Sequence, residues 1–237
     1  YIAKNGYSNT KSVELASNLG QNSLAQFNEQ NADFPGVTIA SKTIRSYPSG
    51  SLASHILGYT SSISSEELKG KEDVYGQNDI IGKTGIEYIM EDYLKGKNGI
   101  KQIDMAVDGT VTDEYISEEA ISGSDVILTI DANLQKVTES TLKDSIESIS
   151  ASEGVNVTGG SAVVMKVKTG EVLAMASYPD FNPQDFVGGI STDKWVYYTK
   201  EAESEYARMH PFVNRAISSP SSPGSTYKMV TAITGLE

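Results

Sequence analysis

The stretch SAVVMKVKTGEVLAMAS, residues 161–177, decides the fold class of this chain. Its two apolar runs, 161–167 and 171–177, have the length of strands, and Lys168-Thr169-Gly170 between them has the composition of a tight turn. Both runs carry apolar residues at odd and even positions, which is typical of a sheet covered by helices. We therefore expect an antiparallel hairpin within an α+β fold.

A long amphipathic helix is predicted just before this hairpin. Leu134, Leu142 and Ile146 recur at helical spacing over 132–150, and Asp131 is a good N-cap residue. A short strand is predicted over 125–130. The polar segment 118–124 is the expected junction between two domains, residues 1–120 and residues 121–237.

The first 120 residues predict a series of short elements. In chain order we expect a polar helix over 1–30, a strand over 37–44, a short helix at 52–57 ended by Gly58, a helix start at 65–68, a loop over 70–84, a helix over 86–94 with Ile86, Ile89, Met90 and Tyr93 on one side, and a hairpin over 100–112 that turns at Asp108-Gly109.

Composition excludes several classes of function. The 237 residues carry a net charge of −12, and an acidic chain repels phosphate backbones, so no nucleic-acid partner is expected. No apolar run approaches the roughly 20 residues that span a bilayer. The chain has no cysteine, and its two histidines, His55 and His210, are interpreted as surface or hydrogen-bonded side chains. Neither a metal nor a cofactor is predicted.

The segment Ser222-Pro-Gly-Ser-Thr-Tyr-Lys228 carries the best indication of chemistry. Pro223-Gly224 supplies a turn that would place Ser225 at the start of a helix, beside unpaired backbone N–H groups and the positive end of the helix dipole. Such a position lowers the energy of a developing oxyanion. Lys228 lies one turn further on the same face, where a partly desolvated amine would accept the serine proton.

Other matches to functional motifs have simpler interpretations. Ser-x-x-Lys also begins at Ser8, Ser140 and Ser191, without a Pro-Gly turn before it. Residues 76–84 nearly match a phosphate-binding loop, but five residues separate the glycines where that loop has four. Lys-Thr-Gly occurs at 83–85 and 168–170, yet in active-serine enzymes this triplet follows the nucleophile. The aromatic residues Trp195, Tyr197 and Tyr198 are interpreted as packing against the domain body, with substrate stacking as the alternative.

Taken together, these blocks resemble a class B penicillin-binding protein, a peptidoglycan D,D-transpeptidase, over nearly the whole chain. The resemblance is carried, in the family's order, by Phe34-Pro35-Gly36-Val37, Arg45-Ser46-Tyr47-Pro48, Ala53-Ser54-His55-Ile56-Leu57-Gly58-Tyr59, Ile81-Gly82-Lys83-Thr84-Gly85-Ile86-Glu87, Tyr93-Leu94-Lys95-Gly96, Leu128-Thr129-Ile130-Asp131, Leu134-Gln135, Thr169-Gly170-Glu171-Val172-Leu173-Ala174-Met175 with Pro179, Asn214-Arg215-Ala216 and Pro223-Gly224-Ser225-Thr226-Tyr227-Lys228.

The resemblance implies a fold and a subgroup. Residues 1–120 would form an elongated, non-catalytic pedestal domain, and residues 121–237 the first part of a β-lactamase-like transpeptidase domain, an antiparallel sheet flanked by helices. The pedestal blocks favour the elongation type or its sporulation relative over the division type. Because the chain starts at Tyr1 and ends at Glu237 within a predicted helix, we expect it to be truncated at both ends.

The resemblance also implies roles for two residues. Ser225 would be the nucleophile that attacks the penultimate D-Ala carbonyl of a stem peptide, and β-lactams would acylate the same serine. Lys228 would be the base, and the Ser225 N–H would be half of the oxyanion hole. The family's second element, Ser-x-Asn, and its third, Lys-Thr-Gly, would lie downstream, so these 237 residues alone should be inactive.

Partners and location follow from the same resemblance. The partners would be the peptidoglycan stem peptide, β-lactam antibiotics and, through the pedestal, a membrane glycosyltransferase or another protein of the elongation complex. The parent protein would sit on the extracytoplasmic side of the bacterial membrane on one N-terminal helix. Two alternatives stay open: a non-catalytic interaction module that docks a cell-wall glycosyltransferase or scaffold, and a β-lactam sensor domain, which the pedestal blocks disfavour.

Overall fold

The computed structural model describes residues 15–16, 19–34, 37–39, 41, 43–76, 79–106, 111–154, 157–200, 203–219 and 222–236. The chain divides into two compact units, Tyr1–Thr43 and Ile44–Glu237. In the first unit the structure describes helix α1 (Gln21–Glu29) and the 3-10 helix η2 (Asn31–Asp33). The helix predicted over 1–30 is therefore found at its end, while residues 1–14 lie outside the described part. The predicted domain boundary at residue 120 stays a prediction.

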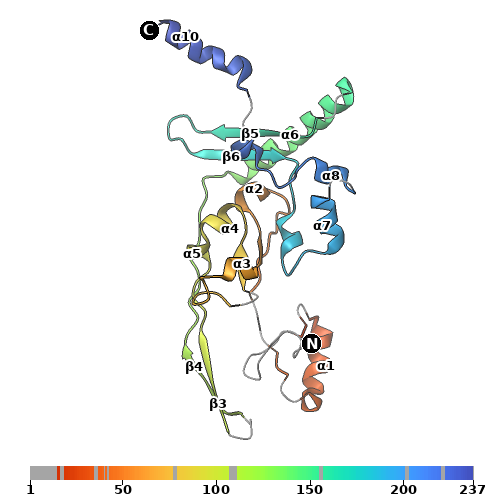
Figure 1. The fold of residues 1–237 in the computed structure, drawn as a ribbon, viewed down its shortest axis with the longest axis vertical. Helices are drawn as coiled ribbons and strands as arrows, with labels where there is room; N and C mark the ends of the chain where they lie inside the picture. Colours follow the sequence, from red (N-terminus) through yellow and green to blue (C-terminus); the bar gives the residue numbers. More distant parts are fainter. Residues whose placement is uncertain are drawn as a thin grey trace. The chain divides into compact units, whose positions relative to one another are not determined.

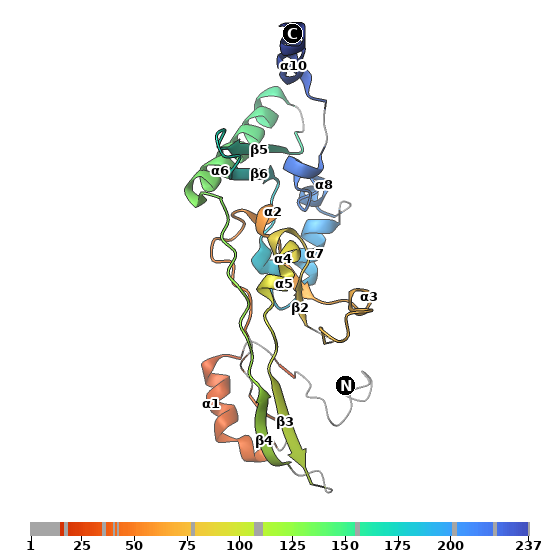
Figure 2. The same ribbon diagram turned by 90° about the vertical axis from the view of Figure 1, so that its left-hand side faces the viewer.

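The second unit combines short helices with antiparallel strand pairs (Figures 1 and 2). Its described elements are, in chain order, α2 (Ser54–Leu57), β1 (Thr60–Ser62), α3 (Ser65–Leu68), β2 (Ile80–Gly82), α4 (Gly85–Ile89), α5 (Glu91–Leu94), β3 (Ile100–Met105), β4 (Val111–Glu118), α6 (Ala132–Glu153), β5 (Gly160–Met165), β6 (Val172–Tyr178), η3 (Pro183–Phe186), α7 (Thr192–Thr199), α8 (Glu205–Arg208), α9 (Arg215–Ser218), η4 (Gly224–Tyr227) and α10 (Lys228–Leu236).

The predicted hairpin over 161–177 is confirmed as β5 and β6. The strands pair antiparallel, with Ala162 opposite Ala176 and Val164 opposite Ala174. The turn between them is closed by the N–H groups of Thr169 and Gly170, which both donate to the Lys166 carbonyl. Helix α6 lies along this pair in both ribbon views. The helix approaches the hairpin closely, since a Cβ at Gly160 would contact Ile146. The opposite face is less covered among the described residues, because Val163 stays 48% exposed.

Helix α6 begins where the sequence predicts. The Asp131 carboxylate accepts hydrogen bonds from the N–H groups of Asn133 and Leu134, both at 2.9 Å, and satisfies two of the donors that a helix start leaves unpaired. The strand predicted over 125–130 is wrong. Those residues form no strand, although the Asp131 N–H donates to the Leu173 carbonyl at the edge of β6.

Replacing the cap gives a first testable change. Asp131→Ala should lower the free energy of unfolding by about 1 kcal/mol, because two N–H groups at the start of α6 lose their acceptor. Urea denaturation of the full-length protein would measure it. Asp131→Asn keeps a capping oxygen and serves as the matched control. Equal losses in the two variants would show that the cap hydrogen bonds do not contribute.

The part of the chain between residues 44 and 95 has a small core of its own. The β1–β2 pair and α3 bury Ile63, Tyr75 and Ile81, with Leu68 packed against them. Sequence reasoning predicted a loop over 70–84 and missed both strands. They are three residues long, so their formation depends on the pairing of Thr60–Ser62 with Ile80–Gly82 and not on local pattern.

The helix predicted over 86–94 is divided at Met90 into α4 and α5. Its predicted apolar side is also wrong, since Ile89 is 69% and Tyr93 63% exposed while Glu87 is buried. Helical periodicity predicts that charged residues face the solvent. Here the Glu87 carboxylate instead accepts hydrogen bonds from Arg45 Nη2 at 2.9 Å and from the Tyr47 hydroxyl at 3.2 Å. Buried charges with such partners are tolerated in a small core.

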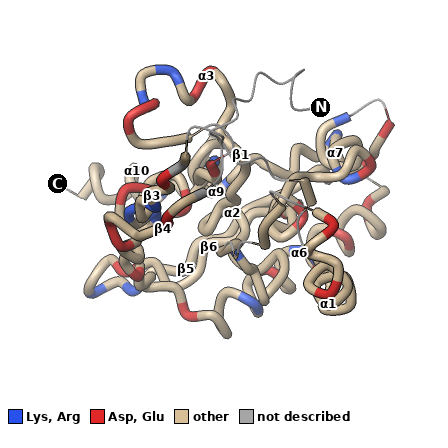
Figure 3. Tube along the Cα trace, turned by 90° about the horizontal axis from the view of Figure 1, so that it is seen from below, with Lys and Arg blue, Asp and Glu red and all other residues tan. Residues whose placement is uncertain are grey.

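The hairpin predicted over 100–112 is confirmed as β3 and β4, although the predicted turn at Asp108-Gly109 lies outside the described residues. The second strand continues to Glu118, further than predicted. Asp104 lies directly opposite Asp113 in this pair, and Figure 3 shows acidic residues at β3 and β4. The strand predicted over 37–44 is wrong, because its described residues have no strand partner.

Candidate active site

The Ser-x-x-Lys segment does form a helix start. Gly224 to Tyr227 make the 3-10 turn η4, and α10 follows from Lys228. Gly224 has φ +56°, in the left-handed region that favours glycine, so the Pro223-Gly224 turn has a backbone reason. The Thr226 hydroxyl and N–H both donate to the Pro223 carbonyl and close the turn. The predicted helix start is thus confirmed one residue earlier, as a 3-10 turn.

The two predicted site residues lie on the same side of this turn. In a 3-10 helix, residues three apart are eclipsed, which places Ser225 and Lys228 above one another. The Lys228 N–H donates to the Ser225 carbonyl, and both side chains are exposed. In the described part of the chain, no hydrogen bond joins the Ser225 hydroxyl to the Lys228 ammonium. The spacing needed for proton transfer is present, whereas the desolvation that would make the lysine a base is not.

The helix that follows has an apolar surface with little cover. Met229, Val230, Ile233 and Leu236 are each more than half exposed among the described residues. An apolar helix of this length depends on packing for its stability. The described residues therefore supply the serine, the lysine and the turn, and leave the site open to water.

The segment that leads to Ser225 is anchored on β6. The Ser177 hydroxyl donates to the Val213 carbonyl at 3.0 Å and accepts the Arg215 N–H at 3.0 Å. The Arg215 guanidinium donates to the Met209 carbonyl at 2.5 Å, and Asn214 caps α9 by accepting the Ala216 N–H. The predicted Asn214-Arg215-Ala216 block thus fixes the chain about ten residues before the nucleophile.

The other Ser-x-x-Lys patterns have structural roles where they can be described. Ser191 caps α7 by accepting the Lys194 N–H at 3.3 Å, and Lys194 pairs with Asp185. Ser140 lies within α6 and its hydroxyl donates to the Val137 carbonyl. Ser8 lies outside the described residues. The Ser191 hydroxyl is used as a helix cap, and the Ser140 hydroxyl is bonded within its own helix, so neither matches the arrangement at Ser225.

The Lys-Thr-Gly copies are likewise structural. Lys83 pairs with Glu67 at 2.5 Å, and Gly85 begins α4. The second copy is the β5–β6 turn, where the Thr169 hydroxyl donates to Glu171. Residues 76–84, weighed as a phosphate-binding loop, contain strand β2 instead.

An aromatic cluster, missed by sequence reasoning, joins early and late parts of the chain. Tyr59, which follows α2, packs among rings that come from residues after 180, and its ring centroid is 4.0 Å from that of Phe186. We call this set the junction cluster: Tyr59, Phe181, Phe186, Tyr198, Tyr206 and Phe212. Tyr198 is 5% exposed, so packing is confirmed for it, whereas Trp195 remains 47% exposed.

The two histidines differ in environment. The ring of His55 packs edge-on against Phe181, and its Nε2 donates to the Pro211 carbonyl at 2.8 Å. Burial lowers the pKa of His55. The prediction of a hydrogen-bonded histidine is confirmed for His55, and His210 lies at the surface with φ +51°.

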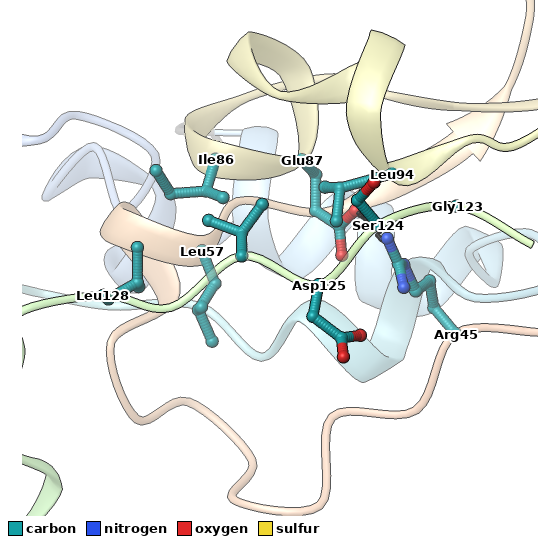
Figure 4. Close-up of a pocket in the computed structure, with 10 residues that line it drawn as sticks. Arg45, Leu57, Ile86, Glu87, Leu94, Gly123, Ser124, Asp125 and Leu128 are labelled. Carbon is teal, nitrogen blue, oxygen red and sulfur yellow. Dashed lines mark hydrogen bonds and ion pairs between the residues drawn. The ribbon is translucent and has the colours of Figure 1, made fainter.

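A second candidate site is a cavity of about 540 Å³ between α4–α5 and the segment 123–128. Figure 4 shows the apolar side chains of Leu57, Ile86 and Leu128 on one side and the charged side chains of Arg45 and Asp125 on the other. Arg45 is already held by Glu87, and burial, together with the Glu87 carboxylate, raises the pKa of Tyr47 to about 12. Its polar lining consists of Arg45, Ser124 and the carboxylates of Glu87 and Asp125, and Glu87 is already bonded to Arg45.

Of the helices that the structure describes, none combines the length and the apolar character needed to cross a membrane. The described residues also contain no group of three or more His, Asp or Glu side chains placed to hold a metal ion. Ser225 and Lys228 are therefore the residues on which a chemical proposal is built.

Comparison with known proteins gives two family matches. Residues 2–128 match the model of the penicillin-binding protein dimerisation domain, and residues 160–237 match the penicillin-binding protein transpeptidase domain. The chain is 32% identical over 228 residues to the peptidoglycan D,D-transpeptidase MrdA of Acinetobacter baumannii, covering 96% of this chain and 31% of that protein. It is 34% identical over 204 residues to penicillin-binding protein 3 of Bacillus subtilis, covering 85% and 27%.

Solved structures agree with these matches. A chain of a peptidoglycan synthase complex that coordinates polymerization and crosslinking superposes with a TM-score of 0.71 at 28% identity, covering 99% of this chain and 41% of that one. The complex of penicillin-binding protein PBP2 with MreC from Helicobacter pylori gives 0.67 at 28% identity, with 96% and 41% covered. The chain spans about a third of the length of the curated relatives it matches.

Proposed function

Because this chain belongs to the class B penicillin-binding proteins, of the elongation type, we propose that it is part of a peptidoglycan D,D-transpeptidase that works through a serine acyl-enzyme. The observation that carries the proposal is the placement of Ser225 and Lys228 one turn apart at the start of η4 and α10. This turn lies inside the segment that matches the transpeptidase domain.

The proposed chemistry assigns one step to each group. Ser225 Oγ attacks the carbonyl of the penultimate D-Ala while Lys228 Nζ takes the hydroxyl proton. The proton then passes to the leaving D-Ala amine, and the amine of a second stem peptide displaces the serine. The Ser225 N–H lies in the first turn of the helix start, where N–H groups lack intrahelical partners, and is suited to stabilise the oxyanion.

Activity requires more than the described residues provide. Lys228 is exposed here, and a lysine needs a desolvated site to act as a base. We therefore expect these 237 residues alone to be inactive and the full-length protein to be active. By the same reasoning β-lactams, which mimic the D-Ala-D-Ala end, acylate Ser225 in the full-length protein.

The partners are proposed from the relatives. One solved relative is bound to MreC and another belongs to a peptidoglycan synthase complex. We expect residues 1–120 to act as the pedestal that docks an elongation-complex protein or a glycosyltransferase, on the extracytoplasmic side of the bacterial membrane. A single anchoring helix is expected in the parent protein.

A purely non-catalytic interaction module is the second candidate. It is favoured by the exposure of Tyr88, Ile89 and Tyr93, three apolar residues on α4 and α5 that are each more than 60% exposed. Under this alternative, Ile89→Asp in the full-length protein would abolish capture of a wall-assembly partner, and no acylation would be detected in any variant. If the enzyme proposal is correct, the same variant remains acylated.

The proposal is tested with the full-length protein and synthetic stem peptides. Mass spectrometry should detect release of D-Ala and a cross-linked dimer, and prior treatment with a β-lactam should block both. Release of D-Ala without a cross-linked product would indicate a carboxypeptidase instead. Absence of both products, in a preparation that also takes up no β-lactam, would count against transpeptidation.

A further inference from the structure

Three hydrogen bonds join residues 47–55 to parts of the chain that follow residue 131. The Tyr47 N–H donates to Gln184 Oε1, the Ala53 N–H donates to Glu139 Oε1, and His55 Nε2 donates to the Pro211 carbonyl, each at 2.8 Å. The first residue of each pair lies in the segment that matches the dimerisation domain, and none of the second residues does. Gln184 and Pro211 lie in the segment that matches the transpeptidase domain, and Glu139 lies on α6, between the two matched segments.

The Ala53 contact continues further into the structure than the other two. Glu139 Oε1 also accepts Gln135 Nε2 at 2.7 Å, one turn earlier on α6. The Gln135 amide bonds the main chain of Met175 on β6 through both of its ends, donating to the carbonyl at 2.9 Å and accepting the N–H at 2.8 Å. Gln135 is completely buried. An unbroken chain of hydrogen bonds thus runs from Ala53 to β6.

The backbone at Ala53 supports a specific role for this chain of bonds. Ala53 has φ +56°, a left-handed conformation that residues with a Cβ rarely adopt, and it precedes α2. The next residue, Ser54, is 1% exposed, and its hydroxyl has no hydrogen-bond partner among the described residues. A strained backbone and an unpaired buried hydroxyl persist where the surrounding structure holds them in place. The side chain that accepts a hydrogen bond from the Ala53 N–H is Glu139.

We propose that Gln135 and Glu139 form a clasp that transmits the position of the pedestal at Ala53 to the main chain of β6 at Met175. Two residues further along β6, Ser177 holds the Arg215 segment that leads to Ser225. The clasp thus ends on β6, the strand that holds the segment leading from Arg215 to Ser225. Its coupling is a property of the fold, and only its consequence for Ser225 rests on the proposed function.

The surroundings of Glu139 make the clasp sensitive to pH. Burial raises the pKa of Glu139, and the Asp180 carboxylate adds to the shift. Asp180 also acts on His55, whose pKa is lowered by burial, and it accepts a hydrogen bond from the Tyr206 hydroxyl. The Arg215 guanidinium is the nearby cation that acts on His55. Because the folded state holds the Glu139 proton more tightly than the unfolded state, this group stabilises the protein fully below the ordinary glutamate pKa of about 4.3. That contribution declines as the pH rises through the folded-state pKa.

Glu139→Gln tests this dependence, since its amide oxygen can accept both hydrogen bonds without a charge. Relative to the wild type, its urea midpoint should be unchanged below pH 4 and higher at pH 7. A pH-independent difference between the two proteins would mean that Glu139 does not titrate in the clasp.

Hydrogen exchange on the full-length protein tests the coupling itself. Gln135→Leu should accelerate exchange of the Ala53 amide about ten-fold, although residue 135 does not touch Ala53. Glu139→Gln should leave that amide at the wild-type rate. Gln184→Leu is the matched control, because it removes the neighbouring contact and should accelerate Tyr47 alone. These rates need no enzyme activity, so they remain informative if the proposed function fails.

The amide of Lys83, which donates to the Tyr59 carbonyl, reports global opening of the same region. If Gln135→Leu accelerates exchange of the Lys83 amide as much as that of the Ala53 amide, the variant has loosened the whole region, and Glu139→Ala is the deciding variant. The proposal requires Glu139→Ala to accelerate exchange of the Met175 amide, which residue 139 does not touch. An unchanged Ala53 rate in Gln135→Leu, or an unchanged Met175 rate in Glu139→Ala, would show two independent contacts and overturn the clasp.

Discussion

Ser225→Ala in the full-length protein should abolish covalent modification by a β-lactam, with a loss in acylation rate of at least about 10³-fold. The substitution removes the hydroxyl that lies one helical turn before Lys228, and an alanine methyl group forms no acyl bond. Intact mass before and after exposure to the antibiotic measures the effect. Tryptic cleavage after Arg215 and Lys228 isolates the peptide 216–228, which should carry the adduct.

The chain offers matched controls for this experiment. Ser191→Ala and Ser140→Ala each remove the serine of another Ser-x-x-Lys pattern, and both should be acylated at the wild-type rate because those hydroxyls serve helix structure. Lys228→Met should slow acylation strongly while leaving Ser225 in place, since the proton acceptor is lost. An adduct that persists in Ser225→Ala, or that maps to another peptide, would remove Ser225 from the proposed mechanism.

Gly58→Ala should destabilise the protein by more than about 3 kcal/mol, the largest effect that we expect from a single methyl group. Gly58 ends α2 with φ +80°, and a Cβ there would overlap the Thr84 carbonyl and approach the Gly85 N–H. The obstructing atoms belong to the main chain, so no side-chain rotation relieves the overlap. The reciprocal position is equally tight, because a Cβ at Gly85 would overlap the backbone of Ile56.

Gly70→Ala separates the two causes of this loss. Gly70 has a similar φ of +77°, but a Cβ there would have nothing within 4 Å, so only backbone strain remains and we expect a loss of about 1 kcal/mol. Urea denaturation of the full-length variants would measure both. Equal losses at the two positions would mean that the α2–α4 contact is looser than the close approach of Gly58 and Thr84 indicates.

The sequence pattern was sufficient to predict those elements whose structure depends on a short contiguous stretch of residues. The hairpin at 161–177, the α6 helix with its Asp131 cap and the stop at Gly58 are present where the sequence predicts them. The β3–β4 pair is also present, with a longer second strand, and the helix start near Ser225 lies one residue earlier. Each depends on contacts within a few residues or on one tight turn. The family could be predicted for the same reason, since its motifs are local blocks in a fixed order.

Local pattern failed where pairing or burial depends on distant residues. Strands β1 and β2 form because they pair with each other although seventeen residues separate them, while the alternating stretch at 37–44 and the apolar stretch at 125–130 have no strand partner among the described residues. Glu87 is buried because Arg45 and Tyr47 bond to it from 42 and 40 residues away. No sequence window contains both members of such a pair.

The sequence by itself determined the family, the order of the parts and the two residues that stand as candidates for chemistry, because these are written in contiguous motifs. Only the tertiary structure decided how the parts are joined. The junction cluster and the chain of hydrogen bonds from Ala53 through Glu139 and Gln135 to Met175 unite residues separated by 86 and 40 positions. Periodicity reports which side chains share a face of one element, and these contacts arise only when the chain folds back on itself.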